Sequence, residues 1–466
     1  MANTAIHCEA LGKRYRLGER PIEETSQHSK RPRLVSSLYR PIFPARTRPP
    51  SKERTLRMRI LFVTWVNCVH TARWIAQLDG LGWDLHIFAV SQSTPHPELR
   101  GVTVHRLITG PRTRSVLPQI GFSWPFARGE TRAMQLLEKF DRYSAAARLA
   151  RLVQSLKPDI VHSLAMHGGA YDVLNARKRI GVQFPPWIYS CWGVDIHHFG
   201  RLPEHEERIR QVLRYSDYMT TDCRRDVQLA REFGFSGETV GVFPGGGGFD
   251  LQEMRAVRQP GPVRSRRVIV VKGYQCHPGS VRNDHPGARG LVAIEALRRC
   301  APLLPGYEVV VYSAYPEVRV AGEQLAREAK LPFRFPPLLT HREMARLFGS
   351  ARIAIGLATS DGTPNAMLEA MIAGAFPIQS DTISTREWID GENGLLVPPE
   401  DATAVAEAIT RAVKDDNMVD RAAELNATMA DQRLERGAIQ AKVIEMYQLV
   451  KAHGGERIRR RAECLV

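Results

Sequence analysis

The chain has 466 residues, 43% of them hydrophobic and 24% charged, with a net charge of +16. This balance is typical of a soluble globular protein with two domains of ordinary size. The sequence contains neither an apolar run of the roughly 18 residues that span a bilayer nor a secretory signal. The seven cysteines form no C-x-x-C pair, which argues against a disulfide framework or a zinc site and leads us to expect a cytoplasmic protein.

The first segment, residues 1–57, is rich in Arg, Pro and Ser and lacks sustained periodicity, so we expect a disordered basic tail. It carries 13 Lys and Arg against 5 Asp and Glu, and residues 451–466 carry 5 against 2. Basic tails can hold a protein near anionic lipid, which suggests peripheral contact with the inner face of a membrane. Solvated tails without a partner explain the charge equally well. No helix-turn-helix, zinc-finger or aromatic–basic pattern appears, so we expect no nucleic-acid partner.

Between residues 58 and 256 the sequence alternates between strand-like and helix-like segments. A segment at 70–80 has Ala72, Ile75 and Leu78 at helical spacing. Short β-branched runs predict four buried strands, at 59–65, 84–90, 159–164 and 187–192. Strand–helix alternation is typical of a doubly wound parallel sheet, so we expect a Rossmann-like first domain over 58–256.

The same pattern restarts after a Pro-, Gly- and Arg-rich segment at 257–267, which reads as a linker. Five further strands are predicted, at 268–274, 307–313, 351–357, 375–380 and 393–399. We therefore expect a second Rossmann-like domain over 268–430, followed by a C-terminal helix and basic tail over 431–466. The fold class is α/β, with two doubly wound domains facing across a cleft, and ligands bind such sheets at the carboxyl ends of their strands.

The segment "SDGTPNAMLEAMIAGAFPIQSD" (360–381) contains the carboxylates Asp361 and Glu369, eight positions apart. Thr363 suits a helix N-cap, Pro364 suits the first helical position and Gly374 suits the position after the end, which predicts a helix over 364–373. Asp361 then lies in the loop before the helix and Glu369 lies in its second turn. The two acids therefore do not share one helical face.

The start of this helix is a natural seat for a diphosphate, because backbone N–H groups and the helix dipole both favour an anion. Gly362, Thr363, Pro364 and Asn365 would line that seat. The flanking acids would then hold neutral hydroxyls of a phosphorylated ligand. An ordinary capped helix with an exposed Glu369 is the simpler alternative.

Two cations are placed to balance a pyrophosphate in the second domain. Lys272 closes its first predicted strand, and Arg289 opens the following helix. Each alone reads as a surface charge, but together they suit a phosphate site opposite the Asp361 loop.

The runs "DGTPNAMLEAMIAGAFPIQSD" and "EWIDGENGLLVPPED" (387–401) resemble the donor-site signature of the retaining glycosyltransferases with two Rossmann-like domains, the GT-B fold of the glycogen-synthase-like group 1. The resemblance covers roughly 58–450. It implies that Glu369 binds the nucleotide ribose and that Asp361, one methylene shorter than the family's glutamate, lies beside the donor sugar. Lys272 and Arg289 are the best matches to the family's phosphate pair, although the long insert "CHPGSVRNDHPGA" separates them.

The resemblance extends to acceptor-side positions in the first domain. His70, in "NCVHTARW", resembles the family's acceptor-side residue, and "SCWGVDI" (190–196) matches its His-Gly-x-Asp loop with Trp192 in place of His and with Asp195 retained. A structural role at a helix start explains His70 equally well, and a buried aromatic explains Trp192. "FPGGGGFD" (243–250) has glycines that permit positive φ and close approach to a ligand, and a flexible turn without contacts is the alternative.

The expected function is transfer of a sugar from a UDP- or GDP-sugar to a saccharide or lipid-linked saccharide, with retention of configuration as the resemblance implies. Lys272, Arg289 and Asp361 would be the catalytic residues, with no cofactor and no metal. The family often builds surface polysaccharides. A catalytically inactive protein that binds a nucleotide sugar or acts as a scaffold is the alternative.

Overall fold

The computed structural model describes residues 58–463 except 92, 107–109, 114–140, 142–143 and 277–286. The expected tail at 1–57 and most of the insert before Arg289 lie outside the described residues. The described residues belong to one compact unit, Thr55–Val466.

The first sheet has eight strands in the order β4-β3-β2-β1-β5-β6-β7-β8, parallel except for β4. Its central strands are buried on both faces, which explains their near-continuous apolar sequences. The strands are β1 (Arg59–Thr64), β2 (Asp84–Ala89), β3 (Thr103–Arg106), β4 (Gly110–Thr113), β5 (Ile160–Leu164), β6 (Trp187–Cys191), β7 (Tyr218–Thr221) and β8 (Glu238–Val242). The helices are α1 (Val69–Ala76), α3 (Ala145–Leu156), α4 (Tyr171–Ile180), α5 (Pro203–Tyr215) and α6 (Arg224–Glu232), with shorter turns η2 (Ala165–Ala170), η3 (Gly181–Gln183) and η4 (Phe199–Arg201).

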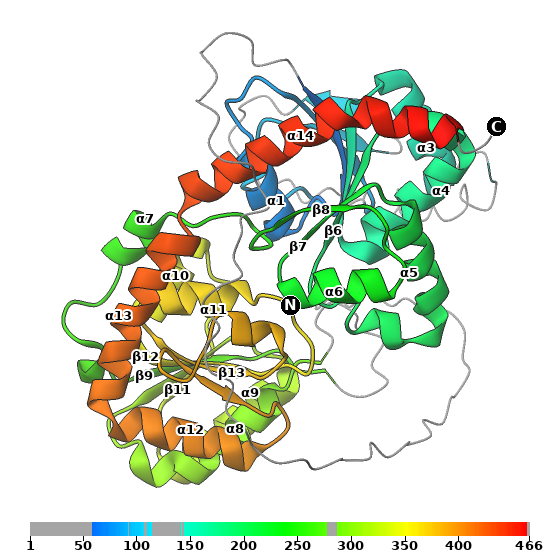
Figure 1. Ribbon diagram of the computed structural model, residues 1–466. Coiled ribbons are helices and arrows are strands. Elements are labelled where there is room, and N and C mark those ends of the chain that lie inside the picture. The colour runs from blue at the N-terminus through cyan, green and yellow to red at the C-terminus, as the bar shows by residue number, and fades with distance from the viewer. Residues whose placement is uncertain are drawn as a thin grey trace, which may run out of the picture. The chain divides into compact units, whose positions relative to one another are not determined.

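The second sheet has six parallel strands in the order β11-β10-β9-β12-β13-β14. They are β9 (Val268–Lys272), β10 (Glu308–Tyr312), β11 (Phe333–Arg334), β12 (Ala351–Gly356), β13 (Phe376–Ser380) and β14 (Leu395–Val397). The helices from here to the C-terminus are α7 (Leu251–Ala256), α8 (Gly290–Cys300), α9 (Pro316–Ala329), α10 (His341–Ser350), α11 (Asn365–Ile372), α12 (Ala402–Lys414), α13 (Asp416–Arg433) and α14 (Arg436–Glu463), with turns η5 (Val263–Ser265), η6 (Ala301–Leu303) and η7 (Ser384–Glu387). Figure 1 shows helices on both faces of this sheet.

The predicted fold class is confirmed. Every strand expected from a β-branched run overlaps an observed strand, and the sheets have the doubly wound order. In each sheet the chain reverses its direction of progress beside the first strand, between β1 and β5 and between β9 and β12. Such switch points open a crevice at the carboxyl ends of the strands, which is where ligands bind.

The segment expected to be a linker, 257–267, is packed against the second domain. Val263 is buried, and the Arg266 side chain is 3% exposed. Arg266 Nη1 donates to the carbonyl oxygens of Ala351, at 3.1 Å, and Ala373, at 3.3 Å. Composition suggested an exposed connection, but the arginine anchors it through buried backbone acceptors.

The last helix, α14, returns to the first domain. Its apolar residues belong to the hydrophobic core beneath β1, and they are Ile439, Val443, Met446, Tyr447 and Val450. The hydroxyl of Tyr447 accepts from Trp74 Nε1 at 2.9 Å and lies 2.7 Å from His162 Nδ1. Figure 1 shows α14, in red, running along the first domain. The segment predicted as a separate C-terminal helix therefore completes the first domain.

None of the described helices is both long enough and apolar enough to cross a membrane.

Candidate active site

Lys272 and Asp361 meet at the switch point of the second sheet. Lys272 ends β9, and Asp361 lies in the loop that follows the neighbouring strand β12. Their Nζ and Oδ2 atoms are 3.9 Å apart, and both side chains are partly exposed. Adjacent parallel strands deliver their following residues to one edge of the sheet, so residues 89 positions apart come together there. The predicted juxtaposition of the cation and the loop acid is confirmed.

Helix α11 begins at Asn365, and its N-cap is Pro364 without a side-chain hydrogen bond. The prediction that Thr363 caps the helix is wrong. Thr363 Oγ1 instead donates to the carbonyl oxygen of Asp222 at 2.5 Å and accepts from Trp388 Nε1 at 3.1 Å. The helix end is as expected, because Gly374 follows it with a φ of +86°.

Glu369 lies on α11 with only 7% of the residue exposed, so the alternative of an ordinary exposed glutamate is wrong. Its Oε1 is 3.0 Å from Arg73 Nη1 on α1 and 3.5 Å from His341 Nε2 on α10. Burial alone would raise the pKa of Glu369, but the neighbouring His341 and the charge of Arg73 lower it below its usual value. The carboxylate is therefore ionised at neutral pH and held by cationic or polar groups from two helices.

A small cavity adjoins these residues beneath the Asp361 loop. Lys272, Asp361 and Pro364 line it together with the carboxyl ends of β12 and β13. Its volume of about 20 Å³ is room for little more than a water molecule. A ligand the size of a nucleotide needs a few hundred Å³, so this cavity can hold only a small part of one.

Arg289 does not face the Asp361 carboxylate as expected. Its Nε donates to Glu400 Oε1 at 2.8 Å, and its Nη1 donates to the carbonyl oxygens of Cys276 and Ala288 at 3.2 Å each. The structure thus brings Lys272, but not Arg289, to the loop acid. The Arg289 guanidinium instead donates its hydrogen bonds to Glu400 and to two backbone carbonyls that precede α8. No pattern in the sequence indicates these partners.

His70 lies in the first turn of α1 and reaches the second domain. Its Nδ1 accepts from Asn365 Nδ2 at 3.0 Å. Burial, assisted by the positive charge of Arg73, lowers the pKa of His70 to about 4. The imidazole is therefore neutral at physiological pH and can serve as a hydrogen-bonding group beside the start of α11.

Trp192 and Asp195 have different surroundings within one loop. The half-buried Trp192 ring packs edge-on against His70 at 5.7 Å and lies 6.5 Å from Trp65. Asp195 is 2% exposed, and its Oδ2 accepts from the backbone N–H groups of Met166 and Trp192 and from the Tyr189 hydroxyl. Burial raises the pKa of Asp195 to about 7. Asp195 therefore stabilises the loop through buried hydrogen bonds. The sequence had led us to expect it among the residues that face the acceptor.

The four-glycine turn before α7 packs closely against α1. Gly247 has a φ of +80°, as a glycine turn permits, and a Cβ added to it would lie 2.9 Å from Gln77 Oε1. A Cβ added to Gly246 would contact Arg73. The alternative of a turn without contacts is therefore wrong, because the turn contacts side chains of the first domain, and approach to a ligand stays a prediction.

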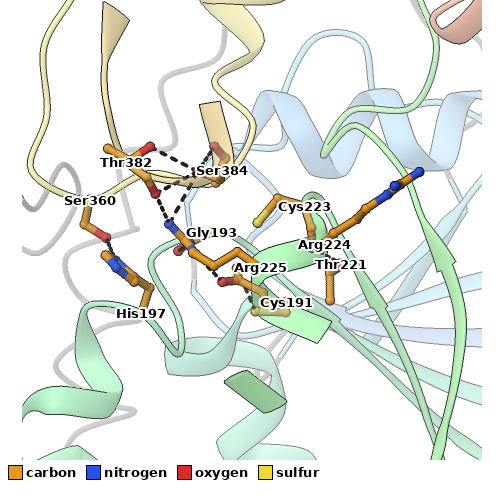
Figure 2. A network of polar contacts seen from close by, with 12 residues as sticks. Cys191, Gly193, His197, Thr221, Cys223, Arg224, Arg225, Ser360, Thr382 and Ser384 are labelled. Atoms are coloured by element: carbon orange, nitrogen blue, oxygen red, sulfur yellow. Dashed lines mark hydrogen bonds and ion pairs between the residues drawn. The ribbon is translucent and has the colours of Figure 1, made fainter. Parts of the chain in front are cut away.

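Sequence reasoning missed the residues that join the two sheets. Arg73 is three positions after His70 on the same helix face, so helical spacing was an available signal. Arg225 and Ser384 carried none, since their contacts arise only in the folded chain. Figure 2 shows Arg225 extending from the first domain toward Thr382 and Ser384, with His197 directed at Ser360.

Asp222, Cys223 and Asp226 form a compact group with ligand-type atoms within 4.8 Å of one another. One Asp226 oxygen already accepts from Arg225 Nε at 2.8 Å, and Cys191 Sγ lies 3.6 Å from the other. This arrangement is that of an ion-paired interior cluster.

Two protein families match the chain in tandem. Residues 59–222 match the family described as Glycosyl transferase 4-like, and residues 291–415 match Glycosyl transferases group 1. The chain is a glycosyltransferase whose second domain matches group 1. The matched segments lie within the two parallel-sheet domains, and the second contains Asp361 and Glu369. No curated protein sequence matches this glycosyltransferase.

Solved structures similar to this glycosyltransferase share its two-domain fold. Sucrose-phosphate synthase from Thermosynechococcus elongatus aligns with a TM-score of 0.59 at 18% identity, over 85% of this chain and 100% of its own. HepE from Anabaena, in complex with UDP and glucose, aligns with a TM-score of 0.58 at 14% identity, over 84% and 100%. A UDP-forming trehalose-phosphate synthase from Burkholderia xenovorans aligns at 0.57 and 15%, over 84% and 99%. These likenesses show the fold, the predicted GT-B pair of Rossmann-like domains.

Proposed function

We propose that the protein transfers a sugar from a UDP- or GDP-sugar to an acceptor, with retention of anomeric configuration and without a metal ion. The observation that carries the proposal is the Lys272–Asp361 pair at the switch point, 3.9 Å apart, beside the start of α11. A cation, a helix N-terminus and a carboxylate together suit a sugar diphosphate, because the first two attract phosphate and the third accepts hydrogen bonds from sugar hydroxyls. The bound UDP in the HepE structure is consistent with this choice of donor.

In this proposal Glu369 holds the nucleotide ribose. Its carboxylate is ionised and enclosed, so two ribose hydroxyls would gain charge-assisted hydrogen bonds in a shielded setting. Arg73 now occupies one of its oxygens at 3.0 Å. Donor entry would therefore exchange this contact between the domains for contacts with the ribose.

Lys272 and the backbone amides at 362–365 would stabilise the diphosphate leaving group as negative charge develops on it. Arg289 would contact the diphosphate only after its ion pair with Glu400 is broken. That ion pair is weak, because Glu400 is largely exposed. Asp361 would accept a hydrogen bond from the donor sugar.

The acceptor would dock on the first domain beside His70 and Trp192. The indole face suits the apolar face of a sugar ring, and the neutral imidazole can accept or donate a hydrogen bond. A saccharide or lipid-linked saccharide fits this surface, and the basic segments at 1–57 and 451–466 support a location at the inner face of an anionic membrane. Building of a surface polysaccharide is the corresponding process.

The proposal is tested by measuring release of free UDP or GDP from nucleotide sugars, with and without saccharide acceptors, after a thermal-shift screen has identified a nucleotide that stabilises the protein. Acceptor-dependent release supports transfer. If a nucleotide raises the melting temperature but no donor–acceptor pair gives release of UDP or GDP, the alternative of an inactive nucleotide-sugar-binding protein is supported.

Two controls address the finer claims. Unchanged turnover in EDTA is expected if no metal takes part. The anomeric configuration of the product, read by NMR against that of the donor, decides between retention and inversion.

A further inference from the structure

Arg225, the second residue of α6, joins the first domain to two loops of the second. Its side chain is 6% exposed. Nη1 donates to the carbonyl oxygens of Asp361 at 2.8 Å and Thr382 at 3.1 Å, and it lies 3.3 Å from Ser384 Oγ. Nη2 donates to the carbonyl oxygen of Gly193 at 2.6 Å. Figure 2 shows the guanidinium between these groups.

The loop that Arg225 contacts is the one that carries the Asp361 carboxylate. Ser384 Oγ adds a second constraint, since it lies 3.0 Å from the carbonyl oxygen of Asp361 and 2.9 Å from that of Gly362. Ser384 thus holds two consecutive backbone carbonyls, those of Asp361 and Gly362, and Arg225 holds the first of them as well. The carboxylate of the same residue points at Lys272.

The loop after β13 has a strained conformation that presents its acceptors to Arg225. Ile383 has a φ of +66° and a ψ of −52°, and Ser384 N donates to the carbonyl oxygen of Thr382 at 2.8 Å, which makes a γ-turn. A β-branched residue at positive φ is strained, and Ile383 is 57% exposed, so burial of its side chain does not select this conformation. The contacts that the turn makes possible, with Arg225 foremost, are what compensate for it.

The charge on Arg225 is balanced within its own domain. Nε donates to Asp226 Oδ1 at 2.8 Å, and Asp226 is fully buried. The second domain offers neutral carbonyl and hydroxyl oxygens. At Arg225, separation of the domains would therefore break only hydrogen bonds to neutral oxygens, which water can replace. The ion pair with Asp226 would stay intact and keep the guanidinium in its orientation.

The backbone beside this contact leaves no room for side chains. A Cβ added to Gly193 would overlap the Gly362 backbone, and one added to Gly362 would overlap the Asp222 carboxylate. Arg225 thus reaches the Asp361 loop only when the two domains are in direct contact.

We propose that Arg225 is a positioning residue that fixes the Asp361 loop when the domains close. The proposal rests on the proposed sugar transfer for its consequence, since a fixed loop places the Asp361 carboxylate against the donor sugar. Domain closure would then be coupled to alignment of the reacting groups.

The test compares Arg225→Ala and Arg225→Lys with Arg231→Ala, a change of an exposed arginine on the same helix. In the full chain without ligand, we expect Arg225→Ala to speed amide hydrogen exchange about tenfold or more around 360–363 and 382–385, because both loops lose their anchor. We expect its Kd for UDP or GDP to stay within about threefold while kcat falls about 10- to 100-fold, because positioning is lost and ground-state binding is kept. Arg225→Lys should recover part of kcat, and Arg231→Ala should match the wild type.

Unchanged exchange in both loops would overturn the proposal, as would faster exchange with unchanged kcat, which would leave Arg225 a purely structural role. If Arg225→Ala does not fold, Ser384→Ala removes one hydroxyl on the other side of the contact. It must then speed exchange at 360–363 and lower kcat, or the proposal fails. A wild-type chain that binds neither UDP nor GDP would instead refute the proposed function, and the exchange comparison would still decide whether Arg225 holds the loops.

Discussion

At the scale of single residues, the two acids of the α11 segment have surroundings that separate their roles. Glu369 is enclosed and paired with Arg73, whereas Asp361 is partly exposed and faces Lys272 at 3.9 Å. An enclosed, permanently ionised carboxylate suits binding of hydroxyls. A carboxylate at the mouth of a small cavity, opposite a flexible cation, suits a group that contacts the sugar once the donor is bound.

Glu369→Ala should weaken UDP or GDP binding about 10- to 100-fold, since hydrogen bonds to a charged group contribute about 1.5–3 kcal/mol. Isothermal titration calorimetry measures the change. Glu407→Ala, an exposed acid on α12, is the control and should bind as the wild type does. Wild-type affinity in Glu369→Ala would remove the ribose assignment.

Lys272→Ala should lower kcat about 100-fold, the usual cost of removing one group that stabilises developing negative charge. Arg289→Ala should cost less, because its guanidinium is engaged by Glu400. Nucleotide release under saturating donor measures both, and the double variant should abolish turnover with the fold intact. An active double variant would mean that the diphosphate lies elsewhere.

At the scale of elements, α14 links the C-terminal part of the chain to the first sheet. Tyr447 is fully buried in this helix, and its hydroxyl bonds to Trp74 on α1 and lies within hydrogen-bonding distance of His162 on β5. One side chain thus connects three elements from distant parts of the sequence. The stability of the first domain depends on a helix that follows the second.

Tyr447→Phe should lower the free energy of unfolding by about 1–3 kcal/mol, because Trp74 Nε1 and His162 lose their partner inside the core. Urea denaturation followed by tryptophan fluorescence measures the loss. The neighbouring exposed change Gln448→Ala should leave the midpoint unchanged. A stability loss no larger than that of Gln448→Ala would show that the hydroxyl network is dispensable.

At the scale of the whole molecule, buried histidines make stability depend on pH. Burial lowers the pKa of His162 to about 3, and His70 and His167 have pKa values of about 4. The unfolded chain binds protons near its ordinary histidine pKa of about 6.5, so between that pH and about 4 the unfolded state carries more protons. Stability from these histidines is therefore present above pH 6.5 and is lost as the pH falls. Asp195, with a raised pKa, acts in the opposite direction.

His162→Gln should make the free energy of unfolding less sensitive to pH, even though the variant is less stable at pH 7. The difference in free energy of unfolding between the wild type and the variant should be smaller at pH 5 than at pH 7 by on the order of 2 kcal/mol. This is the proton linkage expected for one buried histidine. Urea unfolding at the two pH values measures it. A wild-type pH dependence in the variant would show that other groups cause the acid sensitivity.

The sequence alone predicted the two sheets, the helix that ends just before Gly374 and the separation of Asp361 from Glu369, because these follow from local periodicity, turn chemistry and strand order. It also brought Lys272 to the Asp361 loop, since parallel strands deliver their ends to one edge. Only the tertiary structure decided the partners of Thr363, Arg289 and Asp195, the return of α14 and the contacts of Arg225. These contacts depend on hydrogen-bonding partners that come from distant parts of the chain or from local backbone geometry. No local sequence pattern specifies which partner a polar side chain will contact.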